Sequence, residues 1–93
     1  MVSFFNYGNY SSENYGAHTL AFYDGKGNTF YFSYKTLVAF SHNGNTYVRQ
    51  NIWGNTTGKH LNWIDGGDKK SRLTQEEFEQ KYNEFFGDKV ISL

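Results

Sequence analysis

The sequence predicts an α+β domain in which an antiparallel sheet of four to five strands, arranged as a meander, packs against one C-terminal helix. Short segments of alternating apolar and polar residues, separated by turns rich in glycine and asparagine, occupy the first half of the chain. The clearest helical periodicity lies near the C-terminus. Since 93 residues suit one domain, we expect a single domain over 1–93, with the sheet at about 3–53 and the helix at about 75–86.

The strands follow from the alternation and from the turn residues. We expect them at about 3–7, 18–23, 29–34, 36–42 and 46–50. Residues 24–28, with the sequence Asp-Gly-Lys-Gly-Asn, tolerate positive φ and predict a hairpin turn. Asn43-Gly44 is the strongest short hairpin signal. Segment 36–42 is nearly all apolar, which is typical of a strand covered on both faces.

The predicted helix has its own start and stop signals. Thr74 and Glu77 form a capping box, and Leu73 and Phe78 have the spacing of the hydrophobic staple that accompanies it. Gly87 suits the position after the last turn. The apolar stripe of this helix is aromatic and consists of Phe78, Tyr82, Phe85 and Phe86. We expect this stripe to pack on the sheet.

Charge is balanced over the whole chain but not along it. Nine Lys and Arg residues oppose nine Asp and Glu residues, which excludes a wholly basic nucleic-acid clamp and a wholly acidic DNA mimic. Residues 49–72 nevertheless hold five basic and two acidic side chains, whereas residues 73–93 hold two basic and five acidic ones. The chain has no cysteine, which excludes disulfides, thiolate metal sites and a cysteine nucleophile.

Segment 51–72, between the sheet and the helix, is expected to be a functional loop. It is longer than the about 12–15 residues beyond which connections without secondary structure are usually functional or disordered. It contains both tryptophans, Trp53 and Trp63. With the nearby basic residues they match the general pattern of a single-stranded nucleic-acid site, in which cations meet phosphates and aromatic rings stack on bases. Alternatively, the same charged residues form a solvent-exposed segment that leads into the helix.

Three familiar motifs are only approximated in this segment. Residues 54–60 resemble a P-loop but have three residues instead of four between the glycines, and His60 stands where the hydroxyl residue should be. Residues 65–68 lack the ligand spacing of a calcium loop and predict a tight turn. The histidines lack zinc-site spacing. His60 could be a general base, but no nucleophile or carboxylate stands at a recognisable spacing from it, which disfavours a catalytic pair with Asp65. We therefore expect no catalytic residue, no metal and no cofactor.

Tyrosines are expected on the sheet face that the helix leaves uncovered, at Tyr31, Tyr34 and Tyr47. Such a face is typical of a protein-binding surface; alternatively, the N-terminal stretch 4–16 folds across it. Aromatic residues on an edge strand also favour pairing of two copies, so a homo-oligomer is a further expectation. The chain has neither a secretory signal pattern nor an apolar run of membrane-spanning length, which predicts a cytoplasmic protein.

Residues 56–67, followed by basic residues up to Arg72 and by Glu77-Phe78, resemble a family of small phage-encoded proteins of unknown function. The upstream pattern that ends in Arg49, Asn51 and Trp53 is similar as well. The resemblance implies a phage or prophage product in the host bacterial cytoplasm. Small accessory phage proteins often bind and inhibit a host protein, including defence machinery, so the resemblance implies a partner of this kind.

The resemblance thus leads us to expect a non-enzymatic accessory protein that binds and modulates or inhibits a host bacterial protein. The expected binding residues are Arg49, Trp53, Thr56, Thr57, Lys59, His60, Asn62, Trp63, Asp65, Lys69, Lys70 and Arg72. The alternative is a single-stranded nucleic-acid-binding protein that uses Trp53, Trp63 and the basic cluster. An enzyme centred on His60 is the third hypothesis.

Overall fold

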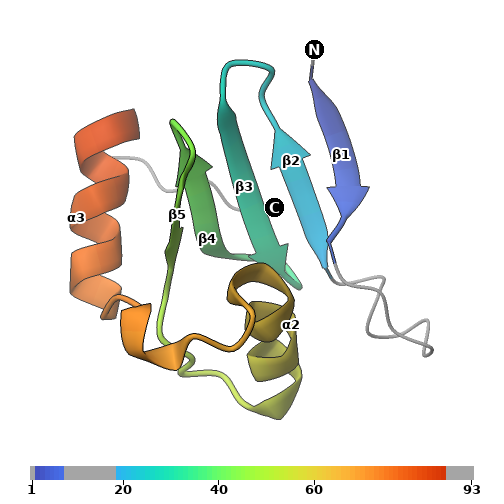
Figure 1. Cartoon of the computed structure of the whole chain (residues 1–93), viewed down its shortest axis with the longest axis vertical. Coiled ribbons are helices and arrows are strands. Elements are labelled where there is room, and N and C mark those ends of the chain that lie inside the picture. The colour runs from blue at the N-terminus through green and yellow to red at the C-terminus, as the bar shows by residue number, and fades with distance from the viewer. Residues whose placement is uncertain (1, 8–18, 88–93) are drawn as a thin grey trace.

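The computed structural model describes residues 2–7 and 19–87, in which five strands form one antiparallel sheet (Figure 1). The strands are β1 (Ser3–Asn6), β2 (Leu20–Tyr23), β3 (Asn28–Ser33), β4 (Thr36–His42) and β5 (Asn45–Val48). Their order in the sheet is their order in the chain, so the predicted meander is confirmed. Residues 8–16, considered above as a cover for the sheet, lie outside the described residues.

Both predicted hairpin turns are present. The Asp24 carboxylate accepts hydrogen bonds from the backbone N–H of Lys26 (2.7 Å) and of Asn28 (3.2 Å), which closes the turn between β2 and β3. Asn43 and Gly44, between β4 and β5, both have positive φ (51° and 84°). Asparagine and glycine adopt this conformation at the lowest steric cost, which is why their order in the sequence specifies the turn.

A β-bulge on β4 changes the faces on which its residues lie. Tyr31 pairs with Ala39 but Phe32 pairs with Leu37, so Val38 is an extra residue on the β4 side. As a result Leu37 packs in the core cluster on one face of the sheet, whereas Val38 and Ala39 pack in the core cluster on the other face. The nearly continuous apolar sequence of β4 therefore fills both faces of the sheet.

The prediction of a single helix is wrong. The segment expected to be a loop contains the helix α2 (Asn55–Asp65) and a short 3₁₀ turn, η1 (Lys69–Ser71), which precede the C-terminal helix α3 (Gln75–Phe86). Helix α2 has weak sequence signals, because Gly54 at its N-cap provides no side-chain cap and Gly58 lies in its interior, where glycine is unfavourable. Two of its three buried residues, Thr57 and His60, are polar, so the apolar period is hard to recognise.

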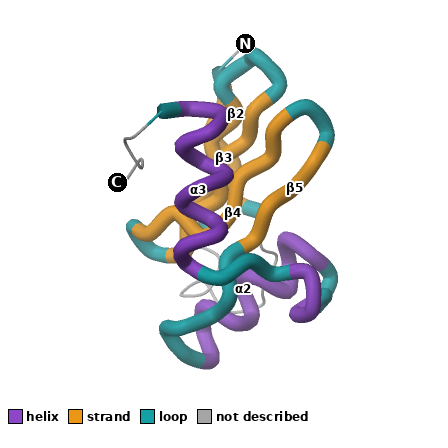
Figure 2. Tube along the Cα trace, turned by 90° about the vertical axis from the view of Figure 1, so that its left-hand side faces the viewer, coloured by secondary structure: helices purple, strands orange, loops and turns teal. Residues whose placement is uncertain are grey.

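The two helices cover opposite faces of the sheet, with α3 lying along the strands (Figure 2). On the α3 face, Phe78 and Tyr82 pack with aromatic and leucine side chains of β3 and β4 in one buried cluster. On the other face, Leu61 of α2 packs against residues of β4 and β5, among them Val48. Within the described residues, neither helix has the length and apolar composition needed to cross a membrane.

Helix α3 begins as predicted. The Thr74 hydroxyl accepts from the Glu77 N–H (3.1 Å), and the Glu77 carboxylate accepts from the Thr74 N–H (2.9 Å), so the capping box is complete. Leu73 and Phe78 pack in the same cluster. Leu73 also forms an isolated parallel bridge with Arg49 next to β5. The start of α3 is therefore attached to the edge of the sheet through backbone hydrogen bonds.

The expectation that Tyr47 faces outward is also wrong. Its ring lies 5.1 Å from that of Phe40 and 5.6 Å from that of Phe85, between the sheet and α3. Tyr31 is partly buried against the α2-side cluster. Tyr34, in the turn between β3 and β4, is 46% exposed. The three tyrosines therefore do not form one open surface.

Truncation of the Phe78 side chain, by which α3 packs on the sheet, is expected to be strongly destabilising. Phe78 is fully buried, and Phe78→Ala should lower the free energy of unfolding by about 3–5 kcal/mol because it leaves a cavity among aromatic rings. Urea unfolding followed by far-UV circular dichroism measures this change. Gln80→Ala, at an exposed position of the same helix, should change stability by no more than about 0.5 kcal/mol. Equal effects of the two substitutions would contradict the assignment of this face.

Candidate functional site

Two hollows open beside helix α2 and share Asn55 in their lining. The first, which we call the aromatic hollow, has a volume of about 350 Å³ and is lined by Ser33, Tyr34, Thr36, Val38, Trp53, Gly54, Asn55, Thr56 and Thr57. The second, which we call the cationic groove, has a volume of about 690 Å³ and is lined by Gln50, Asn51, Asn55, Gly58, Lys59, Asn62, Lys69 and Arg72. Most of the expected binding residues line one of the two.

Arg49 acts as a structural cation beneath Trp53. Its guanidinium carbon lies 5.2 Å from the Trp53 ring centroid and 5.0 Å from that of Phe78. Nη1 donates to the Leu37 carbonyl (2.9 Å), and Nε donates to the side-chain oxygen of Gln75. Burial lowers the pKa of the guanidinium, against the opposing effect of a nearby carboxylate. Arg49 is thus engaged within the protein and contributes to the site by supporting Trp53.

A side-chain-capped turn fixes the backbone at Trp53. The side-chain Oδ1 of Asn51 accepts from the N–H of Trp53 (2.9 Å) and of Gly54 (3.2 Å), and its side-chain Nδ2 donates to the Gly54 carbonyl (2.8 Å). Gly58 lies against this turn, since a Cβ there would be 3.0 Å from the Asn51 amide nitrogen. The absence of a side chain at Gly58 therefore lets Asn51 pack against α2.

His60 lies in the interior and joins α2 to β3. Its Nδ1 is 2.6 Å from the Ser33 hydroxyl, and that hydroxyl is 3.0 Å from the hydroxyl of Thr57. A hydroxyl beside an imidazole is the arrangement that activates a serine nucleophile, but Ser33 is only 3% exposed and His60 is fully buried. The Asp65 carboxylate bonds Arg72 and Gly67, so nothing supports the catalytic His60–Asp65 pair that the sequence already disfavours.

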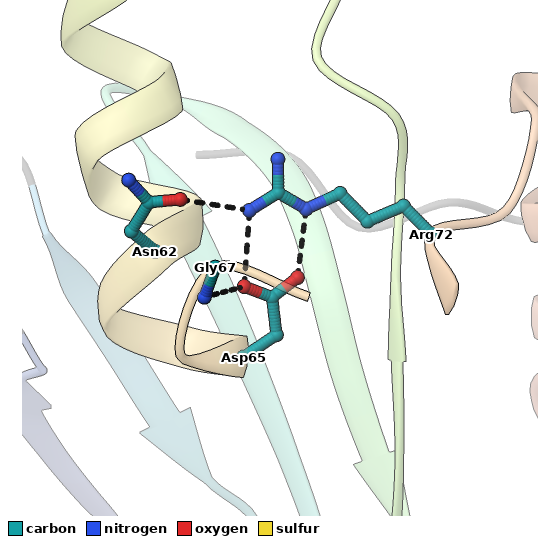
Figure 3. Close-up of polar contacts among 4 residues, drawn as sticks. All are labelled: Asn62, Asp65, Gly67 and Arg72. Atoms are coloured by element: carbon teal, nitrogen blue, oxygen red, sulfur yellow. Dashed lines mark hydrogen bonds and ion pairs between the residues drawn. The ribbon is translucent and has the colours of Figure 1, made fainter. Parts of the chain in front are cut away.

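Arg72 is the most strongly fixed cation of the site (Figure 3). It is 7% exposed. Nε donates to Asp65 Oδ2 (2.7 Å), and Nη2 donates to Asp65 Oδ1 (3.0 Å) and to the Asn62 side-chain oxygen (3.1 Å). The Gly67 N–H also donates to Asp65 Oδ1 (2.9 Å), and Gly66 and Gly67 both have positive φ. The tight turn predicted for residues 65–68 is therefore present, and it aims the carboxylate at Arg72.

The remaining expected residues are dispersed. Lys59 and Lys69 line the cationic groove, whereas exposed Lys70 lines neither hollow. Trp63 is 46% exposed on α2 but is not among the lining residues of either hollow. Trp53 belongs to the aromatic hollow. The two tryptophans that the nucleic-acid hypothesis uses therefore do not line the same hollow.

Several lining residues were missed by the sequence analysis. Ser33 alternates with Phe32 along β3 and so lies on the face of the sheet that α2 covers. The alternation could not mark Ser33 as a lining residue, because the sequence did not predict α2. Gln50, Asn51 and Asn55 line the cationic groove, and single amides in a sequence carry no distinctive spacing. The P-loop resemblance has no structural counterpart, because residues 55–60 are helical and do not form a phosphate-wrapping loop. No three His, Asp or Glu side chains gather as a metal site in the described part of the chain.

Removal of the Asp65 charge should destabilise the protein in a pH-dependent manner. Burial alone would raise the pKa of Asp65, but hydrogen bonds from Arg72 and Gly67 and the Arg72 charge outweigh it and lower the pKa. The carboxylate therefore contributes stability above its unfolded pKa, and this contribution is lost as the pH falls through the folded pKa. Asp65→Asn should lower the free energy of unfolding by about 3 kcal/mol near pH 7.

Urea unfolding between about pH 7 and pH 3 tests this expectation. The difference between the native protein and Asp65→Asn should shrink as the medium becomes acidic. Asp68→Asn, which changes an exposed carboxylate nearby, provides the matched control and should change stability little at any pH. A constant difference for Asp65→Asn would show that the ion pair contributes no pH-dependent stability.

Comparison with known proteins assigns the chain to a family. No curated protein and no solved structure matches it. The model of a family of unknown function, DUF8033, matches residues 5–80. The match includes both hollows and all of the expected binding residues between Arg49 and Arg72. The chain therefore belongs to the family of unknown function DUF8033.

Proposed function

We propose that the protein is a small non-enzymatic accessory protein of a phage or prophage, which binds a host bacterial protein in the cytoplasm and modulates or inhibits it. Host defence machinery is the class of target that the resemblance to phage proteins suggests. The observation that carries the binding role is Trp53, a large aromatic side chain that is both exposed and held in place beside a hollow.

Trp53 combines the properties of an interface anchor. Its side chain is 39% exposed, while the Arg49 guanidinium supports its ring and Asn51 fixes its backbone. A large aromatic side chain that is already ordered loses little conformational entropy on binding. Tryptophan and tyrosine beside a pocket dominate the energetics of many protein interfaces. These features favour a protein partner at the aromatic hollow.

The unfavourable backbone conformation of Tyr34 is a second indication that the aromatic hollow is a binding surface. This residue has φ of 58°, in the left-handed region, which is unfavourable by about 1–2 kcal/mol for residues with an ordinary Cβ. Its side chain is 46% exposed and lines the aromatic hollow with Trp53. The ring lies 5.8 Å from the His60 ring, and asparagine or glycine would suit this turn better. The exposed part of the tyrosine ring therefore supports a contact with a partner.

The lining of the aromatic hollow indicates what part of a partner it accepts. Among the described residues that line it, none carries a charge, and hydroxyl groups such as that of Thr36 alternate with the two rings and Val38. Ile52, next to Trp53, is 66% exposed and extends the apolar area outside. The surface suits an uncharged, partly apolar segment of a partner, with polar groups that reach the hydroxyls.

Affinity capture with matched tryptophan variants tests this proposal. The immobilised protein is exposed to lysate of candidate host bacteria, and the retained proteins are identified by mass spectrometry. The true partner should be retained by the native protein and by Trp63→Ala but not by Trp53→Ala, because Trp63 lies outside the hollow. With purified partner, calorimetry should show a loss of about 2 kcal/mol or more for Trp53→Ala, about thirtyfold in Kd. Equal losses for both variants would place the interface elsewhere.

Tyr34→Asn separates binding from stability. Asparagine tolerates the left-handed conformation, so relief of backbone strain should offset the lost ring contact with His60. The free energy of unfolding should stay within about 1 kcal/mol of the native value, while the affinity for the partner falls. Urea unfolding and calorimetry measure the two quantities on the same preparation. A clear loss of stability would show that the ring serves folding, and unchanged affinity would remove Tyr34 from the interface.

A further inference from the structure

We propose that the cationic groove binds the phosphate group of a nucleotide, supplied either as a free nucleotide or as a unit of single-stranded nucleic acid. This activity uses a different surface from the aromatic hollow and does not depend on the protein partner proposed above. It also differs from a site built on the two tryptophans, since Trp53 belongs to the other hollow.

The first argument is the state of Arg72. Arg72 is only 7% exposed, and its guanidinium is held on one side by Asp65 and Asn62 through Nε and Nη2. Its other terminal nitrogen, Nη1, lies on the side away from Asp65 (Figure 3) and donates to no other described residue. Because Arg72 lines the groove, it provides a fixed donor for an oxygen of an incoming anion. Such a prepositioned guanidinium is well suited to phosphate.

The second argument is the charge around Arg72. Lys59 comes from α2 and Lys69 from η1, and both line the groove with Arg72. Within the described residues, no Asp or Glu lines it; Asp65 contacts Arg72 but is not part of the lining. The three cations come from separate segments and outnumber the carboxylate of Asp65, which contacts Arg72. They therefore create a local positive potential in a protein with no net charge.

The third argument is the size of the groove and its amides. A volume of about 690 Å³ is in the range of sites that bind whole small molecules, and it exceeds what one phosphate fills. Side-chain amides of Gln50, Asn55 and Asn62 line the rest. Amides donate and accept, so they match the edges of bases and sugar hydroxyls. An acidic peptide could satisfy the cations and these amides as well, so what favours a nucleotide is a base that can stack on an aromatic ring.

Trp63 adds an aromatic surface near the cations. It follows Lys59 by four residues on α2, so the two side chains are neighbours on the helix surface, and its ring is 46% exposed. Stacking of a base on such a ring is a common element of sequence-tolerant binding to single strands.

Titrations of the full ¹⁵N-labelled chain at low salt test the proposal. Four probes are compared by chemical-shift changes: inorganic phosphate, uridine 5′-monophosphate, a twelve-nucleotide oligothymidylate and a hexaglutamate peptide. The amides of Lys59, Asn62 and Lys69 and the Nε–H of Arg72 should shift with both nucleotide probes. Tighter binding of the oligonucleotide than of the mononucleotide identifies a strand as the ligand, and the reverse identifies a free nucleotide.

Matched lysine variants locate the site. Lys69→Ala, at an exposed position, should weaken nucleotide binding about tenfold. For a strand, it should also lower the slope of log K against log salt by about 0.7, the value for one phosphate contact. Lys26→Ala removes the same charge in the β2–β3 turn, at the end of the sheet away from α2 (Figure 1), and should leave binding unchanged. Trp53→Ala should leave it unchanged as well.

Three results would overturn the proposal. The first is the absence of shifts with both nucleotide probes at millimolar concentration. The second is equal weakening by Lys69→Ala and Lys26→Ala, which would indicate a general charge effect. The third is tighter binding of hexaglutamate than of either nucleotide probe, which would make the groove a site for an acidic protein segment.

Discussion

Much of the structure depends on the position of one guanidinium. Arg49 donates to the Leu37 carbonyl in β4 and to Gln75 at the start of α3, and its charge lies over the rings of Phe78 and Trp53. One side chain thereby joins the sheet, the first turn of α3 and the segment that leads to α2. These carbonyl and π groups replace water around the partly buried guanidinium. Because all of them contact the same cation, their positions relative to one another are fixed.

The opposite face of the sheet is held by different chemistry. Helix α2 contributes few apolar contacts, chiefly through Leu61 and Ile64, and its other buried side chains form a polar network with Ser33. Hydrogen bonds in a low-dielectric interior are directional, so they fix the orientation of α2 more sharply than apolar packing of the same size would. The positions of both hollows depend on that orientation, since α2 supplies part of each lining.

The sheet and α3 could be predicted from the sequence because each has a local signal: alternation, an Asn-Gly turn and a capping box at Thr74. Helix α2 could not, because its buried face contains Thr57 and His60 and its start has no capping side chain. Most of the expected binding residues line the two hollows, but their contacts depend on parts of the chain that are distant in the sequence. Nothing in a linear sequence shows that Arg49 is engaged beneath Trp53 or that Asp65 holds Arg72.

The order of the strands has a consequence for how the molecule opens. Every sheet pairing joins neighbouring strands. In contrast, the contacts that hold the helices against the sheet join residues far apart in the chain, such as Ser33 with His60 or Arg49 with Gln75. An element that is held by only a few contacts to residues distant in the sequence opens locally at a lower free-energy cost than the strands of a central sheet. We therefore expect the amide hydrogens of α2 to exchange with solvent sooner than those of β3 and β4, and we expect a ligand at either hollow to slow that exchange first.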